Sequence, residues 1–74
     1  MYNDSINIGK EIREELMLQE RSVVWLAKKL GCERTSVYRI FNARSIDTDL
    51  LLHLSVILKK DFFQLYSSFL KNIE

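Results

Sequence analysis

Apolar residues recur at three- and four-residue steps along most of the chain, a period that predicts amphipathic helices. Strand-like alternation is absent from the sequence, so five successive helices are expected. The first should begin between Asp4 and Asn7, whose short polar side chains can cap backbone N–H groups, and should continue to about Gln19. Its buried stripe is Ile8, Ile12 and Leu16.

The stretch from Ser22 to Arg44 predicts two short helices joined by one tight turn. Ser22 is a good N-cap, and Gly31 can adopt the positive φ that ends a helix at low cost. A small side chain at Ala27 lets two helix backbones approach closely. The expected buried positions of the first of these helices are Val23, Leu26, Ala27 and Leu30. Trp25 lies beside this stripe and is expected to cover a gap between this helix and the C-terminal one.

The second helix of the pair is expected over residues 34 to about 42. Val37, Ile40 and Phe41 would point inward. The outer face would then carry Arg34, Thr35, Tyr38 and Arg39, with Ser36 at its margin. Two arginines, a tyrosine and hydroxyls suit the DNA major groove, although charged outer faces are also normal on any surface helix.

Residues 48 to 58 predict a fourth helix, with Asp47 as its N-cap and Ile46 packing on Leu51. This helix is so rich in leucine, isoleucine and valine that we expect it to be central and covered on more than one side. His53, which lies within it, is expected to be structural or exposed.

The final helix is expected to open with a capping box formed by Asp61 and Gln64. Its apolar stripe contains Phe62, Leu65, Tyr66, Phe69 and Ile73, and Phe63 and Leu70 widen it. A monomer does not need so much apolar surface on a terminal helix. Residues 67–74 are therefore interpreted as a helical extension for dimerisation, with Tyr66, Phe69, Leu70 and Ile73 as the predicted dimer contacts.

Composition fits a single all-α domain over residues 1–74: the chain has no proline, two glycines and one cysteine. The net charge is only +1, but it is unevenly distributed. Residues 21–44 hold six cations against one acid, a local charge of +5, whereas residues 1–20 carry −3 and residues 45–74 carry −1. The two helices predicted between Ser22 and Arg44 are therefore the part of the chain expected to contact a phosphate backbone.

The residues that support catalysis or metal binding do not form a pattern in this sequence. Cys32 is the only cysteine and His53 the only histidine, so neither a disulfide nor a structural zinc site is expected. There is no catalytic constellation or glycine-rich phosphate loop, and neither a cofactor nor a small-molecule ligand is indicated. Without a signal peptide or a long apolar run, the protein is expected to be cytoplasmic.

The segment LAKKLGCERTSVYRI, residues 26–40, resembles the helix-turn-helix of the repressor and Cro-like (XRE-type) family of bacterial and phage DNA-binding domains. The resemblance extends from about Ile8 to Tyr66. It implies a compact five-helix lambda-repressor-like domain that binds double-stranded DNA as a homodimer on a palindromic operator. It also implies a bacterial or phage source.

The resemblance also implies roles for specific residues. The family's base-reading positions correspond here to Arg34, Thr35, Ser36 and Arg39, with Tyr38 beside them. Its phosphate-binding positions correspond to Ser22, Asn42 and Arg44, and charge adds Arg21 and Lys28. Many members pair an arginine in the first helix with an acid at the end of the third. Because Leu16 and Phe41 stand there instead, we expect an apolar contact between them.

A second function stays open at this point. A helical protein-interaction module could keep the fold without binding DNA. Three features favour that alternative: the near-neutral net charge, the apolar C-terminal helix, and Val23 at a position where the family often has a polar residue.

Overall fold

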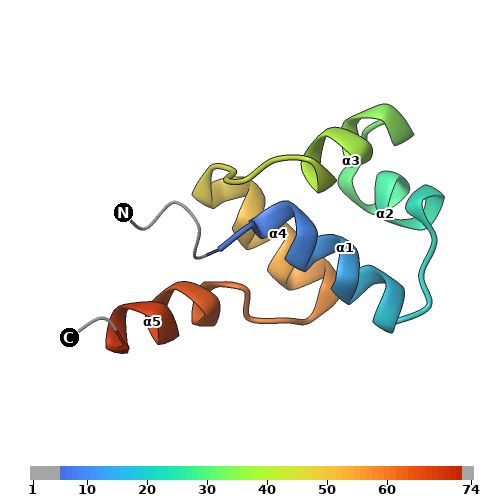
Figure 1. The fold of residues 1–74 in the computed structure, drawn as a ribbon. Coiled ribbons are helices and arrows are strands. Elements are labelled where there is room, and N and C mark those ends of the chain that lie inside the picture. Colours follow the sequence, from blue (N-terminus) through green and yellow to red (C-terminus); the bar gives the residue numbers. More distant parts are fainter. Residues whose placement is uncertain (1–5, 73–74) are drawn as a thin grey trace.

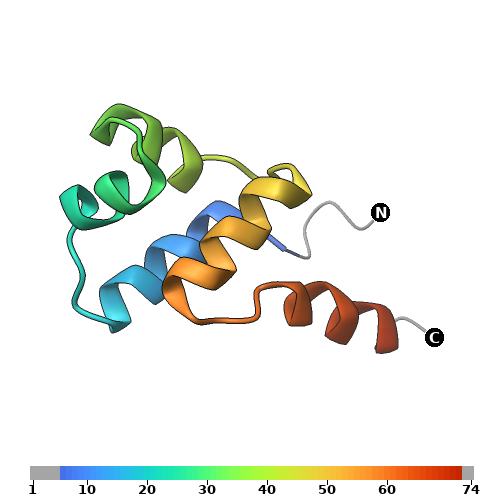
Figure 2. The same cartoon turned by 180° about the vertical axis from the view of Figure 1, so that it is seen from behind.

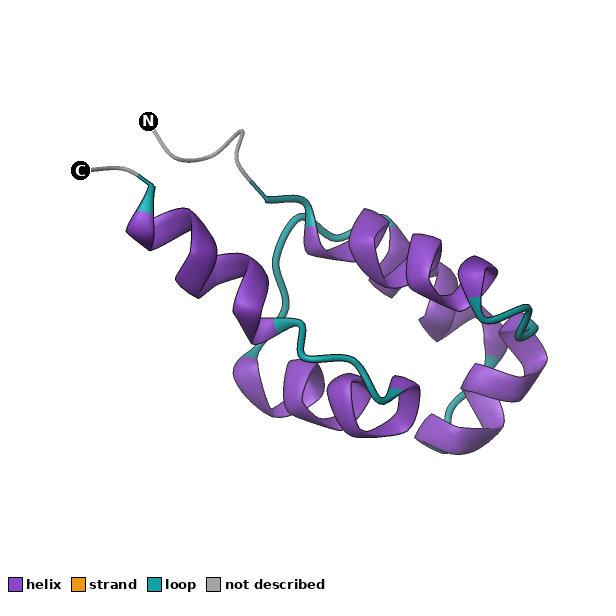
Figure 3. Cartoon of the chain, turned by 90° about the horizontal axis from the view of Figure 1, so that it is seen from below, coloured by secondary structure: helices purple, strands orange, loops and turns teal. Residues whose placement is uncertain are grey.

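The computed structural model describes residues 6–72, which fold into five helices with no strand in this range. Their bounds are α1 Ile8–Leu18, α2 Val23–Leu30, α3 Arg34–Phe41, α4 Thr48–Leu58 and α5 Phe63–Lys71. Figures 1 and 2 show α2 and α3 at one end of the molecule, α1 and α4 in the middle, and α5 at the other end. Figure 3 shows the short loops that connect these helices. The expected all-α, five-helix architecture is confirmed.

Three helices begin where a short polar side chain caps them. Asn7 Oδ1 accepts from the N–H of Lys10 at 3.3 Å, and Ser22 Oγ accepts from that of Trp25 at 3.0 Å. Asp47 Oδ1 accepts from Leu50 N at 2.7 Å. Each bond satisfies a backbone donor that the first turn of a helix leaves unpaired. The predicted caps Ser22 and Asp47 are confirmed. The first helix starts at the later end of its expected window, and Asp4 lies outside the described residues.

The apolar stripes predicted for the first four helices meet in one core. Its fully buried members are drawn from every helix except α5, and Phe62, which directly precedes α5, is also completely buried. The core comprises Ile8, Ile12, Leu16, Leu26, Ala27, Val37, Ile40, Leu51, Leu54, Leu58 and Phe62. Leu16 is 2% exposed, and Phe41 is half-buried and packs against the same core, so neither side chain is largely exposed; the direct contact between the two stays a prediction.

The predictions for α4 and α5 hold only in part. The central helix α4 packs against both α1 and α2, but its apolar surface is not all covered: Leu51, Leu54 and Leu58 are buried, whereas Leu52 and Val56 are 56% and 66% exposed. Asp61 does not cap α5 with its side chain; its backbone carbonyl accepts from Gln64 N at 3.2 Å instead. Phe62, directly before the helix, is completely buried and has helical dihedral angles (φ −68°, ψ −22°), and backbone carbonyls rather than a side chain accept from the first N–H groups of α5.

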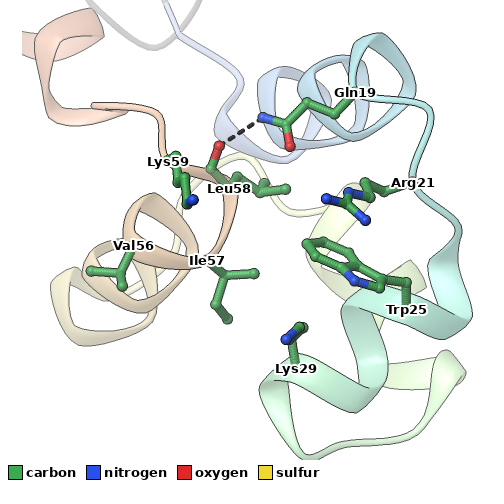
Figure 4. Close-up of a pocket in the computed structure, with 8 residues that line it drawn as sticks. All are labelled: Gln19, Arg21, Trp25, Lys29, Val56, Ile57, Leu58 and Lys59. Carbon is green, nitrogen blue, oxygen red and sulfur yellow. Dashed lines mark hydrogen bonds between the residues drawn. The ribbon is translucent and has the colours of Figure 1, made fainter.

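The expected place of Trp25 is also corrected. The indole does not bridge to α5 but lines a pocket with the C-terminal turn of α4 (Figure 4). The half-buried residues at the start of α5, Phe63, Leu65 and Tyr66, connect that helix to the core. Further along α5, no residue through Asn72 is fully buried.

Candidate nucleic-acid interface

The exposed side of α3 carries the residues that the sequence assigned to base contacts. Arg34, Thr35, Tyr38 and Arg39 are all exposed, and Ser36 is half-buried. Their spacing of one, four and five residues places the four exposed side chains on one face of the helix. The opposite face is held in the core by Val37 and Ile40.

A left-handed turn at Gly31 determines the direction of α3 relative to α2. Gly31 has φ of 73° and ψ of 34°, the conformation that favours glycine, and the N–H of Cys32 donates to Ala27 O at 3.0 Å. Ala27 is 4% exposed, and α2 and α3 pack directly on each other. The turn and the small side chain thus hold α3 across α2 with its polar face outward.

The loop that follows α3 is fastened to the start of α1. Gly9 N donates to Ala43 O at 2.9 Å, and Ile8 N donates to Arg44 O at 3.2 Å. These bonds fix the backbone of the loop, while the side chains of Asn42 and Arg44 stay exposed. Two of the predicted phosphate-binding residues are therefore carried on a backbone held in place beside α3.

A cationic cavity lies between α1 and α3. It has a volume of about 330 Å³ and is lined by Lys10, Arg13, Tyr38, Phe41 and Asn42. The Tyr38 ring meets the Phe41 ring edge-on, with centroids 6.0 Å apart, so Tyr38 is oriented by an aromatic neighbour. Two cations of α1 consequently stand next to the polar face of α3.

Lys10 and Arg13 were not predicted as part of this surface, because residues 1–20 carry a net negative charge. Their three-residue spacing does indicate that both side chains lie on one side of α1. They lie close to α3 because of the way α1 crosses that helix, and this crossing follows from tertiary packing rather than from local sequence.

The other predicted phosphate contacts occupy separate places. Lys28 is exposed in the last turn of α2. Ser22 is exposed at the opposite end of the same helix, and its hydroxyl hydrogen can still be donated while its oxygen accepts from Trp25 N. The Arg21 guanidinium lies 4.5 Å from the centre of the Trp25 ring, in the pocket on the α4 side of α2, so Arg21 is not grouped with the cations beside α3.

The predicted dimer contacts are partly exposed on α5. Tyr66 and Phe69 are half-buried, and Leu70 is 62% exposed. Ile73 lies outside the described residues. Burial raises the pKa of Tyr66 above its ordinary value of 10.0.

No protein-family model matches the sequence, and no similar curated protein or solved structure was found. Within residues 6–72, His, Cys, Asp and Glu side chains form no group of three or more that could hold a metal ion. None of the helices in that same range combines the length and the apolar character that a bilayer crossing requires. The α3 surface itself is therefore the feature from which a function can be inferred.

Proposed function

We propose that this protein is a small transcriptional regulator that binds double-stranded DNA sequence-specifically, with α3 in the major groove. The observation that carries the proposal is the exposed face of Arg34, Thr35, Tyr38 and Arg39, flanked by Lys10 and Arg13 of α1. No acid occurs within α3, and Glu33, which is exposed at the N-cap position, is the one acid of residues 21–44, so positive charge predominates on the side that would approach phosphates.

Each group of residues has a distinct role in this proposal. Arg34 and Arg39 donate paired hydrogen bonds to guanine edges, and each contributes about 1–3 kcal/mol of discrimination against the wrong base. Thr35, Ser36 and Tyr38 contact thymine methyl groups or neighbouring polar edges.

Residues at the two ends of the α2–α3 pair contact DNA phosphates. Ser22 and the N-terminal N–H groups of α2 contact phosphates of one DNA strand. Asn42 and Arg44, in the loop that is hydrogen-bonded to α1, contact the DNA backbone beyond α3. Lys28 adds positive charge on α2, and Arg21 adds it just before that helix. Pairing of two copies through α5 would place two α3 helices on the half-sites of a palindrome.

A protein-interaction module is the second candidate. It is favoured by Met17 and Leu18, which are 63% and 78% exposed and form a shallow apolar depression with Glu14. In that case the cations of α3 would be an ordinary solvated face.

Fluorescence anisotropy with a labelled random duplex separates the two candidates. DNA binding predicts affinity that falls linearly with salt on logarithmic axes, by a slope of about −0.9 per phosphate neutralised. The absence of salt-sensitive binding at low ionic strength would exclude the DNA proposal. Selection of bound sequences from random DNA, repeated with Arg39→Ala, then tests base reading: an unchanged motif would remove Arg39 from that role.

A further inference from the structure

A second cationic cavity lies on the side of α2 that faces α4, away from the α3 surface. It has a volume of about 680 Å³, within the range of small-molecule sites. It lies between α2, the α1–α2 connection and the C-terminal turn of α4 (Figure 4). Its lining residues are Gln19, Arg21, Trp25, Lys29, Val56, Ile57, Leu58 and Lys59.

The cavity is cationic. Arg21, Lys29 and Lys59 all line it, and none of its described lining residues is an acid. The one ion pair recorded within residues 6–72 joins Lys60 Nζ to Glu15 Oε1 at 3.7 Å and lies outside this lining. The three cavity cations are therefore left without a carboxylate partner in the described part of the chain.

An aromatic side chain orients two of these cations. The Arg21 guanidinium is 4.5 Å from the centre of the Trp25 ring, and Lys29 Nζ is 5.9 Å from it. Cation–π contact on this ring limits the conformations of the guanidinium, so its N–H fork is partly preorganised for a planar anion.

The facing wall is apolar and held in place. Ile57 points across the cavity towards the side that carries Trp25 and Lys29 (Figure 4). Next to it, Gln19 Nε2 donates to the carbonyl of Leu58 at 2.6 Å and to Glu15 Oε2 at 2.8 Å. These bonds tie the end of α1 to the end of α4 and fix the edge of the cavity.

We propose that this cavity binds a small amphipathic carboxylate, a molecule with an aromatic or aliphatic body and one carboxylate group. Arg21 takes the carboxylate through paired hydrogen bonds, and Lys29 adds a second positive charge. The body of the ligand packs between Ile57 and the indole of Trp25. Such a site gives the protein an effector input that is separate from α3.

Trp25 supplies the readout because it is the only tryptophan in the chain, so a ¹⁵N-labelled sample gives one indole N–H cross-peak. Benzoate is titrated against benzamide, which matches its shape without charge, and against inorganic phosphate, which supplies charge without an apolar body. We expect a saturable shift of the Trp25 peak with benzoate, at a Kd at least tenfold below those of both other probes.

Variants locate the site. Arg21→Gln and Lys29→Gln keep the tryptophan and lie on exposed positions, so helical content measured by circular dichroism should be unchanged. Arg21→Gln should weaken benzoate binding by about tenfold or more, the effect of losing a hydrogen-bonded charge, and Lys29→Gln by a smaller factor. Lys71→Gln removes the same charge at the exposed end of α5, outside the cavity, and should leave the benzoate Kd unchanged.

Three results would overturn the proposal. One is the absence of a saturable shift up to about 10 mM benzoate, well above the ~1 mM Kd of a weak ligand. Another is equal binding of benzoate and benzamide, and the third is an equal effect of Lys71→Gln and Arg21→Gln. Tighter binding of the short acidic peptide acetyl-Glu-Phe-Glu-amide than of benzoate would instead identify a protein-docking site and would also reject the small-molecule assignment. No DNA is used, so the outcome does not depend on the DNA proposal.

Discussion

Gly9 in the first turn of α1 donates its N–H to the carbonyl of Ala43 at 2.9 Å, across the end of α3. The approach is so close that a Cβ at Gly9 would lie 2.5 Å from Phe41 O and 2.6 Å from Ala43 O, and would also collide with Ile40 O. These are backbone atoms, which cannot turn aside as a flexible side chain would. The absence of a side chain at Gly9 therefore permits the contact that fixes the end of α3 and the loop with Asn42 and Arg44.

Gly9→Ala is expected to destabilise the fold by about 2–3 kcal/mol or more, since overpacking a close contact forces the backbone to move. Gly31→Ala is the matched comparison: no atom lies within 4 Å of its added Cβ, but its φ of 73° is strained for alanine. It should cost only about 1–2 kcal/mol. Urea denaturation followed by circular dichroism measures both, and a Gly31→Ala loss larger than that of Gly9→Ala would contradict this account.

Lys10 and Arg13 are expected to contribute to DNA affinity without changing sequence preference. If each neutralises one phosphate, Lys10→Gln or Arg13→Gln should make the logarithmic salt slope less steep by about 0.9 and leave the selected motif as in the parent protein. Lys71→Gln, at the far end of α5, is the charge-matched control and should have little effect. Equal slopes for all three variants would show that the cavity between α1 and α3 does not face DNA.

The local features of this fold could be predicted from sequence because they depend on neighbouring residues. Ser22 and Asp47 cap the helices that follow them, and Gly31 adopts the left-handed conformation expected of it. The fourth helix has the predicted bounds because a cap precedes it, and Lys59 in the left-handed region ends it.

Features that join distant segments could not be predicted in the same way. The approach of Gly9 to Ala43 and the position of Arg13 beside α3 both follow from the crossing of α1 and α3, which no short pattern encodes. The apolar run in α4 was misleading for a related reason. Composition showed that the helix is hydrophobic, but only the packing shows that Leu52 and Val56 face outward.

The raised pKa of Tyr66 predicts that the folded protein loses stability at high pH. Burial raises the pKa of this phenol above 10.0 in the folded protein, so the folded state holds the proton more tightly than the unfolded chain. Its contribution is fully present below pH 10 and is lost as pH rises through the higher folded pKa. The melting temperature of Tyr66→Phe should therefore fall less than that of the parent protein above pH 10.

A spectroscopic titration checks the cause of that difference. Subtracting the absorbance titration of Tyr66→Phe at 295 nm from that of the parent protein isolates the tyrosinate signal of Tyr66. We expect its midpoint above pH 10. A midpoint at or below pH 10 would show that burial does not control this group.

The α5 helix is expected to pair two copies of the chain, since its half-buried and exposed apolar residues include Tyr66, Phe69 and Leu70. Sedimentation velocity at tens of micromolar protein should show a dimer. Leu70→Glu would place a carboxylate in the apolar contact and should weaken dimerisation at least tenfold, about 1.4 kcal/mol, because burying an unpaired charge is costly. Met17→Glu introduces the same charge at an exposed apolar position of α1 and should leave the dimer intact. A monomeric parent protein would remove α5 as the interface, and an equal effect of both variants would show that net charge, rather than contact at α5, controls association.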